Sequence, residues 1–466
     1  MRKFLICFTA LFISLSLFAQ QDTATLDVEQ VLQLVRQYHP LVKQAEINID
    51  MADAEILRAR GAFNPLINNY IASKTLDNTN YYNYLSPSVT IPTWYGIEIN
   101  AGLEELTGDR LSDADTRGKT SYLGATVPLL KNLIIDKRRA YLQQAKLFKE
   151  MSYTEQRVVV NNILFDAAAT YWEWANAYQA FKIIEQNLKI STDRFILIKK
   201  TVEFGERPAI DTVEALTQLQ IFEFLRNDAF LEFQNKGIEL SLFLWRDNNE
   251  AYLLPEWVAP TLSWNNETNI QNFNLLLLDL LATAQRQHPE LIIYNQKLQI
   301  LEVDRRLKFQ ELLPKLDFTY NRLSKGYNVL GAKGALFDNN YQYGLKLQFP
   351  LWFSEGRGAY RQAKLKITEN EILQSEKRFM IETKLRNYFN DFLMLKKQIA
   401  LQSATLLNYN RLLRAEETLF LNGESSLFLI NARENKVLET ERKLTELKTK
   451  YYKTVYALQW SSGVLL

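Results

Sequence analysis

Two carboxylates, Asp211 and Glu214, follow Gly205 by six and nine positions at the predicted start of a helix. A spacing of three places both side chains on one helix face. If several copies of the chain lined one pore, rings of these acids would select cations. The alternative stays open that both acids stabilise the helix N-terminus through its dipole, worth about 0.3 to 1 kcal/mol each.

The residue types for catalysis and metal binding are sparse. His39 and His288 are the only histidines, and each stands before a proline where a predicted helix ends. The sequence has no Cys/His cluster, nucleophile elbow, P-loop or dinucleotide fingerprint. We therefore predict that the chain is not an enzyme and holds no cofactor.

Three further clusters favour structural interpretations. Residues 331–334, Gly-Ala-Lys-Gly, suit a hairpin loop better than a ligand-binding loop. The basic run Lys137, Arg138 and Arg139 is either the rim of a membrane region or a solvated helix face, and we favour the solvated face. Aromatic residues recur at 171, 172, 174 and 178, which indicates helix packing more than a ligand cage.

Two exceptionally long helices must position these residues. Residues 129–204 and 359–422 contain neither Gly nor Pro, and their apolar residues recur at heptad-like steps. Helices of this length are on the order of 100 Å long, which predicts a rod or tube. Shorter helices are predicted at 26–38, 41–61 and 209–250, and again from about 275 to 287 and from there to about 313.

The chain is a duplication. His39 and His288 lie 249 positions apart, as do the helix-ending prolines Pro65 and Pro314. We predict a first repeat at 20–252, a linker at 253–273 and a second repeat at 274–466. Each repeat reads as two short helices, strands, a long helix, a tight turn and a further helix.

The strand regions alternate apolar and polar residues with a period of two. The clearest alternation is over 341–349, where the apolar positions are Tyr341, Tyr343, Leu345, Leu347 and Phe349. These lengths and aromatic ends match membrane-spanning strands, and we predict about four per chain. The strand-like segment within 76–118 has no place in this scheme.

Residues 1–19 have the charged start and apolar core of a signal peptide, which implies export. Without Arg2 and Lys3, 53 basic residues face 53 acidic residues, so nothing indicates a nucleic-acid partner. The single cysteine, Cys7, lies within the leader, which excludes a disulfide in the mature chain. No run after the leader is long and apolar enough for a transmembrane helix, so an exported chain of this kind would meet a membrane through strands.

The chain has the repeat, helix breaks at 39–40 and 288–289, strand exits at 127–129 and 349–351, and turns at 205–211 and 423–429. Together these features resemble the TolC-like outer-membrane efflux proteins. The resemblance implies a mainly α fold with a β-barrel part. Duplicated antiparallel helices would form a periplasmic tunnel, and the strands of a homotrimer would share one barrel in the outer membrane of a Gram-negative bacterium. It also implies an exit duct that works with a periplasmic adaptor and an inner-membrane transporter.

Physical reasoning supports the need for several copies, because about four strands cannot close a membrane barrel, for which the minimum is about eight. In the family, acidic residues six and nine places after the second turn glycine charge the periplasmic aperture. This chain has Leu429 and Ala432 there, so Leu429 suits an apolar constriction. The predicted aperture comprises Gly205, Glu206, Arg207, Asp211, Glu214, Gly423, Glu424, Leu429 and Asn431.

One alternative stays open, a secreted or periplasmic coiled-coil protein with a structural or adaptor role. It explains the long helices but leaves the alternating strand at 341–349 without a purpose.

Overall fold

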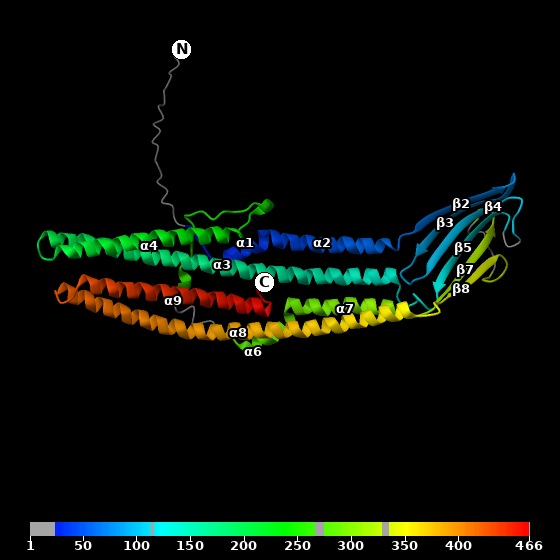
Figure 1. Cartoon of the computed structure of the whole chain (residues 1–466). Coiled ribbons are helices and arrows are strands. Elements are labelled where there is room, and N and C mark those ends of the chain that lie inside the picture. The colour runs from blue at the N-terminus through cyan, green and yellow to red at the C-terminus, as the bar shows by residue number, and fades with distance from the viewer. Residues whose placement is uncertain (1–23, 113–115, 266–274, 329–334, 466) are drawn as a thin grey trace, which may run out of the picture. The chain divides into compact units, whose positions relative to one another are not determined.

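The computed structural model describes residues 24–112, 116–265, 275–328 and 335–465, so the predicted signal peptide and the loop at 331–334 lie outside the described residues. The chain forms two compact units, and each unit contains segments from both halves. One unit comprises Pro40–Phe165, Leu275–Asn390 and Ala457–Leu466 and holds a β-sheet; the other comprises Met1–His39, Asp166–Asn274 and Asp391–Tyr456 and is mainly helical. Figure 1 shows the elements of both units along the chain.

The described part of the sheet unit contains six strands in one antiparallel sheet, in the order β2-β3-β4-β5-β7-β8. Successive strands are neighbours throughout, as in a meander (Figure 1). The strands are β2 (Leu66–Leu76), β3 (Thr79–Pro92), β4 (Glu98–Thr107), β5 (Gly118–Pro128), β7 (Lys315–Lys325) and β8 (Tyr341–Gln348).

The expected number of about four strands is too low. The surplus in the first half is a hairpin, β3 and β4, whose segment had no place in the sequence-based scheme. The turn at Gly96, with φ +82°, reverses the chain there, and Thr93 and Ile97 are joined by a backbone hydrogen bond of 2.9 Å. Among the described residues, the first half therefore supplies four strands of this sheet and the second half two.

The strand register separates an apolar face from a polar one. Cross-strand partners on one face include Val89 with Ala101, and Phe318 with Leu345. On the other face Asn100 pairs with Gly124 and Asn321 with Gln342. The alternation in single strands thus continues across the sheet, because a side-chain period of two aligns equivalent faces of paired strands.

Helices α2 (Pro40–Gly61), α6 (Leu277–Gln287) and α7 (Pro289–Gln310) accompany the sheet, with the first parts of α3 (Lys137–Glu203) and α8 (Ser354–Leu421). The expectation that the first long helix begins at 129 is wrong. Asp136 caps the helix instead, because its carboxylate accepts a 2.8 Å hydrogen bond from the Arg139 backbone N–H. Residues 129–136 therefore form a loop between β5 and α3.

The helical unit contains α1 (Val28–Tyr38), α4 (Ala209–Ser241), α9 (Leu427–Ser462) up to Tyr456, and the later parts of α3 and α8. Helix α4 ends at Ser241 and does not reach 250. Farther along, Asn248 and Asn249 have positive φ angles that a helix does not adopt. A short parallel ladder joins β1 (Thr25–Leu26) to β6 (Ala259–Pro260), so part of the predicted linker packs beside the chain's beginning.

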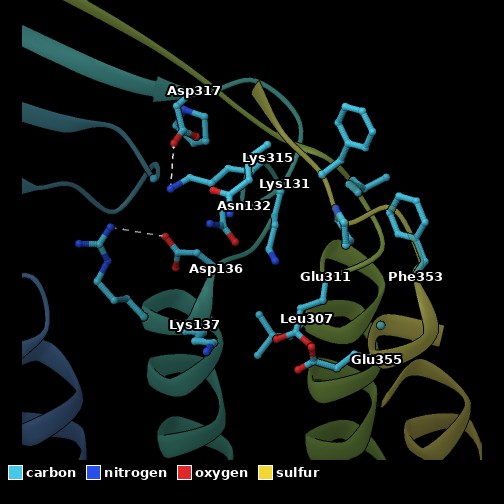
Figure 2. Close-up of a pocket in the computed structure, with 18 of the residues that line it drawn as sticks. Lys131, Asn132, Asp136, Lys137, Leu307, Glu311, Lys315, Asp317, Phe353 and Glu355 are labelled. Atoms are coloured by element: carbon cyan, nitrogen blue, oxygen red, sulfur yellow. Dashed lines mark ion pairs between the residues drawn. The ribbon is translucent and has the colours of Figure 1, made fainter. Parts of the chain in front are cut away.

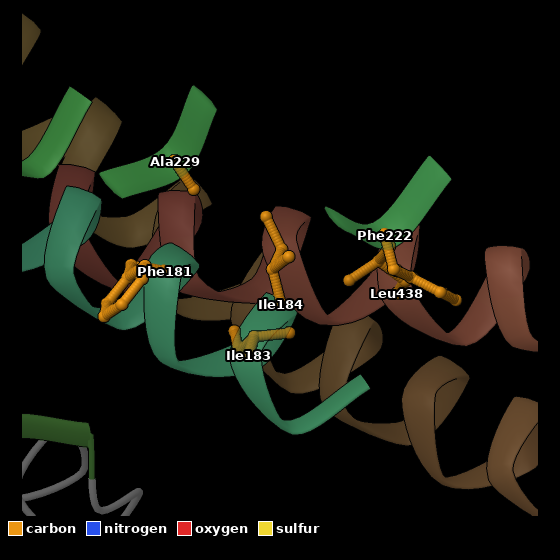
Figure 3. Close-up of a cluster of buried hydrophobic side chains, with 6 residues drawn as sticks. All are labelled: Phe181, Ile183, Ile184, Phe222, Ala229 and Leu438. Atoms are coloured by element: carbon orange, nitrogen blue, oxygen red, sulfur yellow. The ribbon is translucent and has the colours of Figure 1, made fainter. Parts of the chain in front are cut away.

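Side chains from three helices form the core near the middle of the helical unit. Figure 3 shows Phe181 and Ile184 of α3, Phe222 of α4 and Leu438 of α9 in one buried cluster. The aromatic residues at 171–178 also pack internally: Trp172 stacks on Tyr452 at 4.5 Å, and the Tyr171 hydroxyl donates to the Leu26 carbonyl at 3.0 Å. The helix-packing interpretation of this stripe is correct.

Both His-Pro breaks are confirmed, because His39 and His288 each have an extended ψ between two helices. Among the described residues, no helix combines the length and the apolar character that a membrane crossing needs.

Candidate functional site: the paired turns and the two-faced sheet

The two Gly-Glu turns have the same backbone geometry. Gly205 and Gly423 adopt φ angles of +75° and +78°, a conformation that favours glycine at the end of a helix. The Glu206 N–H binds the Thr201 carbonyl at 3.0 Å, and the Glu424 N–H binds the Leu419 carbonyl at 2.9 Å. Each turn therefore ends one long helix and reverses the chain in the same way.

Arg207 connects the first turn to the end of α8. Its guanidinium lies 3.7 Å from the centre of the Phe420 ring and donates a 3.1 Å hydrogen bond to the Phe420 carbonyl. The same group pairs with Asp211 at 3.4 Å. One planar cation thus joins three groups from two hairpins, which is the kind of site that suits Arg better than Lys.

Both predicted carboxylates have partners in the structure. Asp211 faces Arg207, and Glu214 accepts a 3.2 Å hydrogen bond from the Asn431 amide. Asn431 is buried, whereas Leu429 is 42% exposed. The structure therefore brings Asp211 and Glu214 of the first turn together with Phe420 and Asn431 of the second.

A buried ion pair deeper in the same unit escaped the sequence reasoning. Arg194 of α3 donates both guanidinium nitrogens to the Glu434 carboxylate of α9 at 2.5 Å, and only 6% of the Glu434 side chain is exposed. Each partner lies eleven positions from its own turn glycine, on opposite sides of the turn. This equal spacing from the two turn glycines was the feature of the sequence that could have indicated the ion pair.

The tips of both turns carry exposed apolar side chains. Phe204, Ile210 and Val213 flank the first turn, and Leu421 and Phe428 flank the second, with exposed fractions from 59% to 79%. Clusters of this kind are typical of protein interaction sites.

In the sheet unit, the predicted strand residues lie where the alternation requires. Tyr341, Tyr343, Leu345 and Leu347 occupy one face of β8, opposite Arg322, Tyr320, Phe318 and Leu316 respectively, and Phe349 follows the strand. On the polar face, Asn100 donates to the Thr126 hydroxyl at 3.1 Å, and that hydroxyl lies 3.2 Å from the Thr319 hydroxyl. Hydrogen bonds thus run across three strands on the side that sequence reasoning assigned to water.

A hollow of about 740 Å³ lies where the polar face meets the helices. Figure 2 shows Lys131, Lys137 and Lys315 around it with Asp136 and Asp317, and Lys315 pairs with Asp317 at 3.1 Å. Both positive and negative side chains line this hollow, so its charge does not favour ions of one sign.

The solvated-face interpretation of the basic run is wrong for two of its residues. Arg138 pairs with Glu98 at 2.7 Å, and Arg139 is only 16% exposed beside Asp136. Both side chains hold loops at the end of the sheet nearest the helices, which we call the base of the sheet. The carbonyl and carboxylate groups of these loops need hydrogen-bond donors.

The family comparison concerns the first half of the chain. Residues 31–221 match the family model described as outer membrane efflux protein. The predicted resemblance to the TolC-like outer-membrane efflux family is confirmed. A comparison with curated proteins finds no match.

Solved structures of outer-membrane proteins share the fold over nearly the whole chain. The Campylobacter jejuni CmeC outer membrane channel is 15% identical, with a TM-score of 0.63 over 94% of this chain and 85% of that one. The outer membrane protein VceC from Vibrio cholerae is 12% identical, with a TM-score of 0.62 over 94% and 96%. The open state of the Neisseria gonorrhoeae MtrE outer membrane channel is also 12% identical, with a TM-score of 0.62 over 94% and 88%.

The fold is mainly α with a smaller β part, as the sequence predicted. Proteins of this family are transport channels, so the prediction that the chain is no enzyme is confirmed. The family match and the shared fold relate this chain to the outer-membrane efflux proteins.

Proposed function

We propose that three copies of this chain close their sheets into one outer-membrane barrel and form the exit duct of a tripartite efflux or type I secretion system. The observation that carries the proposal is the sheet with one apolar face, one polar face and two open edges. In the described residues, β2 bonds only to β3, and β8 bonds only to β7. Open edges in lipid leave backbone groups without partners, each of which costs several kcal/mol.

Strand direction favours closure between copies. Six antiparallel strands leave β2 and β8 running in opposite directions, so β8 of one copy meets β2 of the next in antiparallel fashion. Six strands are fewer than the eight or so needed for the smallest membrane barrels. Three copies supply eighteen, within the range of bacterial barrels. The choice of three over two rests on the resemblance to the efflux channels.

The polar face would then line the lumen, and the apolar face would contact outer-membrane lipid. Helices α3 and α8, which follow the strand exits, would extend into the periplasm and end at the two Gly-Glu turns. Those turns would form the aperture, with Arg207, Asp211, Glu214, Leu429 and Asn431 around it. The exposed apolar tips at Phe204 and Phe428 would meet a periplasmic adaptor, which links the duct to an inner-membrane transporter.

Membrane fractionation tests the location, and mass measurement tests the assembly. We expect recovery in the outer membrane, heat-modifiable migration on a gel, and a detergent-purified particle with the mass of three chains. A stable monomer that keeps its strands, or recovery in the soluble periplasm, would contradict the proposal. Periplasmic recovery would favour the coiled-coil structural or adaptor alternative.

A further inference from the structure

Two loops at the base of the sheet expose apolar side chains. The loop at 129–136 after β5 leaves Leu133 48% and Ile134 72% exposed, while the adjacent Ile135 is buried. The turn between β3 and β4 leaves Trp94 53% and Tyr95 80% exposed. Exposed apolar side chains gathered on neighbouring loops are typical of an interaction site.

A single guanidinium holds the two loops together. One terminal nitrogen of Arg139 donates to the Tyr95 carbonyl at 3.4 Å and to the Leu133 carbonyl at 3.2 Å. The other terminal nitrogen donates to the Asn132 carbonyl. The backbones of both loops are thus hydrogen-bonded to one half-buried side chain, that of Arg139. We call the exposed side chains of Trp94, Tyr95, Leu133 and Ile134 the loop tips.

Gly96 makes room for this guanidinium. A Cβ atom at this position would lie 2.6 Å from the Arg139 Nη2 atom, and the φ angle of +82° also disfavours other residues. Trp94 is fixed as well, because its ring stacks on the buried Phe63 at 4.2 Å. The loops are therefore built to present these side chains in one arrangement.

The chemistry around the two tips fits a phospholipid surface. Ile91 and Ile99, a cross-strand pair beside the turn, are each 39% exposed on the apolar face of the sheet, so the apolar surface continues into the tips. Trp and Tyr concentrate at membrane interfaces, where an apolar ring and a polar atom meet both phases.

We propose that Trp94, Tyr95, Leu133 and Ile134 form an interfacial anchor that seats among the phospholipid headgroups at the periplasmic edge of the membrane, with Arg139 as its positioning residue. The inference rests on the proposed membrane function of the sheet. The anchor sets the depth at which the strands cross the bilayer, because it marks where the apolar face ends.

Single-cysteine labelling tests the anchor separately from the proposed function. Ile134→Cys, Leu345→Cys and Ile221→Cys are made in a Cys7→Ser background, labelled with an environment-sensitive fluorophore and placed in phosphatidylethanolamine and phosphatidylglycerol vesicles. Spin-labelled lipids with the quencher near the headgroup or deep in the acyl chain are then compared. We expect the shallow quencher to act best at 134, the deep quencher to act best at 345, and neither to act at 221 on α4.

The outcomes separate the two proposals. If lipid-borne quenchers act on the label at 345 but not on the label at 134, the anchor is wrong. Protection of the label at 134 from an aqueous quencher would then mean that protein covers the loop tips. Absence of lipid quenching at both 134 and 345 contradicts the membrane function itself.

Arg139→Lys tests the clamp, because an ammonium group cannot reproduce a planar fork that reaches two loops. We expect loss of the shallow-quencher preference at 134 with no change at 345. Gly96→Ala should act in the same direction through its contact with Arg139. Arg138→Lys is the matched control, since the Arg138 guanidinium pairs with the carboxylates of Glu98 and Asp136, whereas that of Arg139 binds the backbone carbonyls of Tyr95 and Leu133. Unchanged quenching in Arg139→Lys would overturn the clamp.

Discussion

Arg207 lies over the ring of Phe420: its guanidinium carbon is 3.7 Å from the ring centre, and the same group donates a hydrogen bond to the Phe420 carbonyl. The two residues belong to different repeats and are 213 positions apart. The contact therefore links the first turn to the helix that leads into the second.

Arg207→Ala should loosen the turns and raise the resting conductance of the channel in planar bilayers. A cation–π contact of this kind is worth about 0.5 to 2 kcal/mol, enough to shift a gate held by a few such contacts. Arg226→Ala is a suitable control, because Arg226 also lies over aromatic rings, those of Phe181 and Phe230, but farther along α4. Equal conductance changes in the two variants would mean that the turns do not gate the channel.

Neutralising Asp211 and Glu214 together, as Asp211→Asn with Glu214→Gln, should reduce cation preference and block by multivalent cations. Three copies would present six carboxylates at the aperture, and acidic rings favour cations. Reversal potentials in a salt gradient measure the effect. Unchanged selectivity would place the charged mouth elsewhere and favour a local role for the pair Asp211–Arg207.

Glu434→Gln should destabilise the helical unit by about 3 to 5 kcal/mol, because it leaves the Arg194 cation buried without its counter-charge. The double variant Arg194→Met with Glu434→Met should lose much less, since it removes both desolvated charges. Chemical unfolding midpoints of the purified protein compare the two. A double variant as unstable as the single one would show that packing, rather than the unpaired charge, causes the loss.

Leu345→Arg should impair assembly, at a cost of about 2 to 4 kcal/mol near the bilayer midplane. Leu345 pairs with Phe318 on the apolar face, whereas Gln342 pairs with Asn321 on the polar face. Gln342→Arg is thus the matched control and should assemble normally. The yield of heat-modifiable oligomer in membranes reports both, and equal tolerance would contradict the assigned faces.

Protonation of His288 should lower stability as the pH falls from 6.5 to about 4. Burial lowers the pKa of His288 to about 4, with smaller effects from Glu290, Lys377 and Lys384. The unfolded chain, with its pKa near 6.5, binds the proton first, so stability is complete above pH 6.5 and falls until the folded pKa is passed.

His288→Asn should flatten this dependence while keeping an acceptor for the Glu290 N–H, which His288 Nδ1 binds at 3.3 Å. Unfolding midpoints across this pH range provide the measurement. His39→Asn serves as the comparison, because burial lowers the pKa of His39 too. An identical slope in His288→Asn and the unaltered protein would rule out His288 as the titrating group.

Local sequence determined the helices and their breaks. The residue before a proline is disfavoured in a helix, so His39 and His288 are extended and α1 and α6 end just before them. Glycine at positive φ ended α3 and α8 at the turns. The long runs without Gly or Pro, the duplication and the two faces of β8 follow from the same short-range rules. These features were enough to indicate the efflux family.

The tertiary structure decided which residues far apart in the sequence contact one another. The joining of β5 to β7 in one sheet and the contact of Arg207 with Phe420 depend on partners in the other half of the chain. Arg139 shows the reason most clearly: its charge predicts a solvated helix face, yet carbonyls from two loops and the space left by Gly96 bury it. A hydrogen-bond donor takes its role from the acceptors that the fold places around it, and periodicity along one segment carries no information about them.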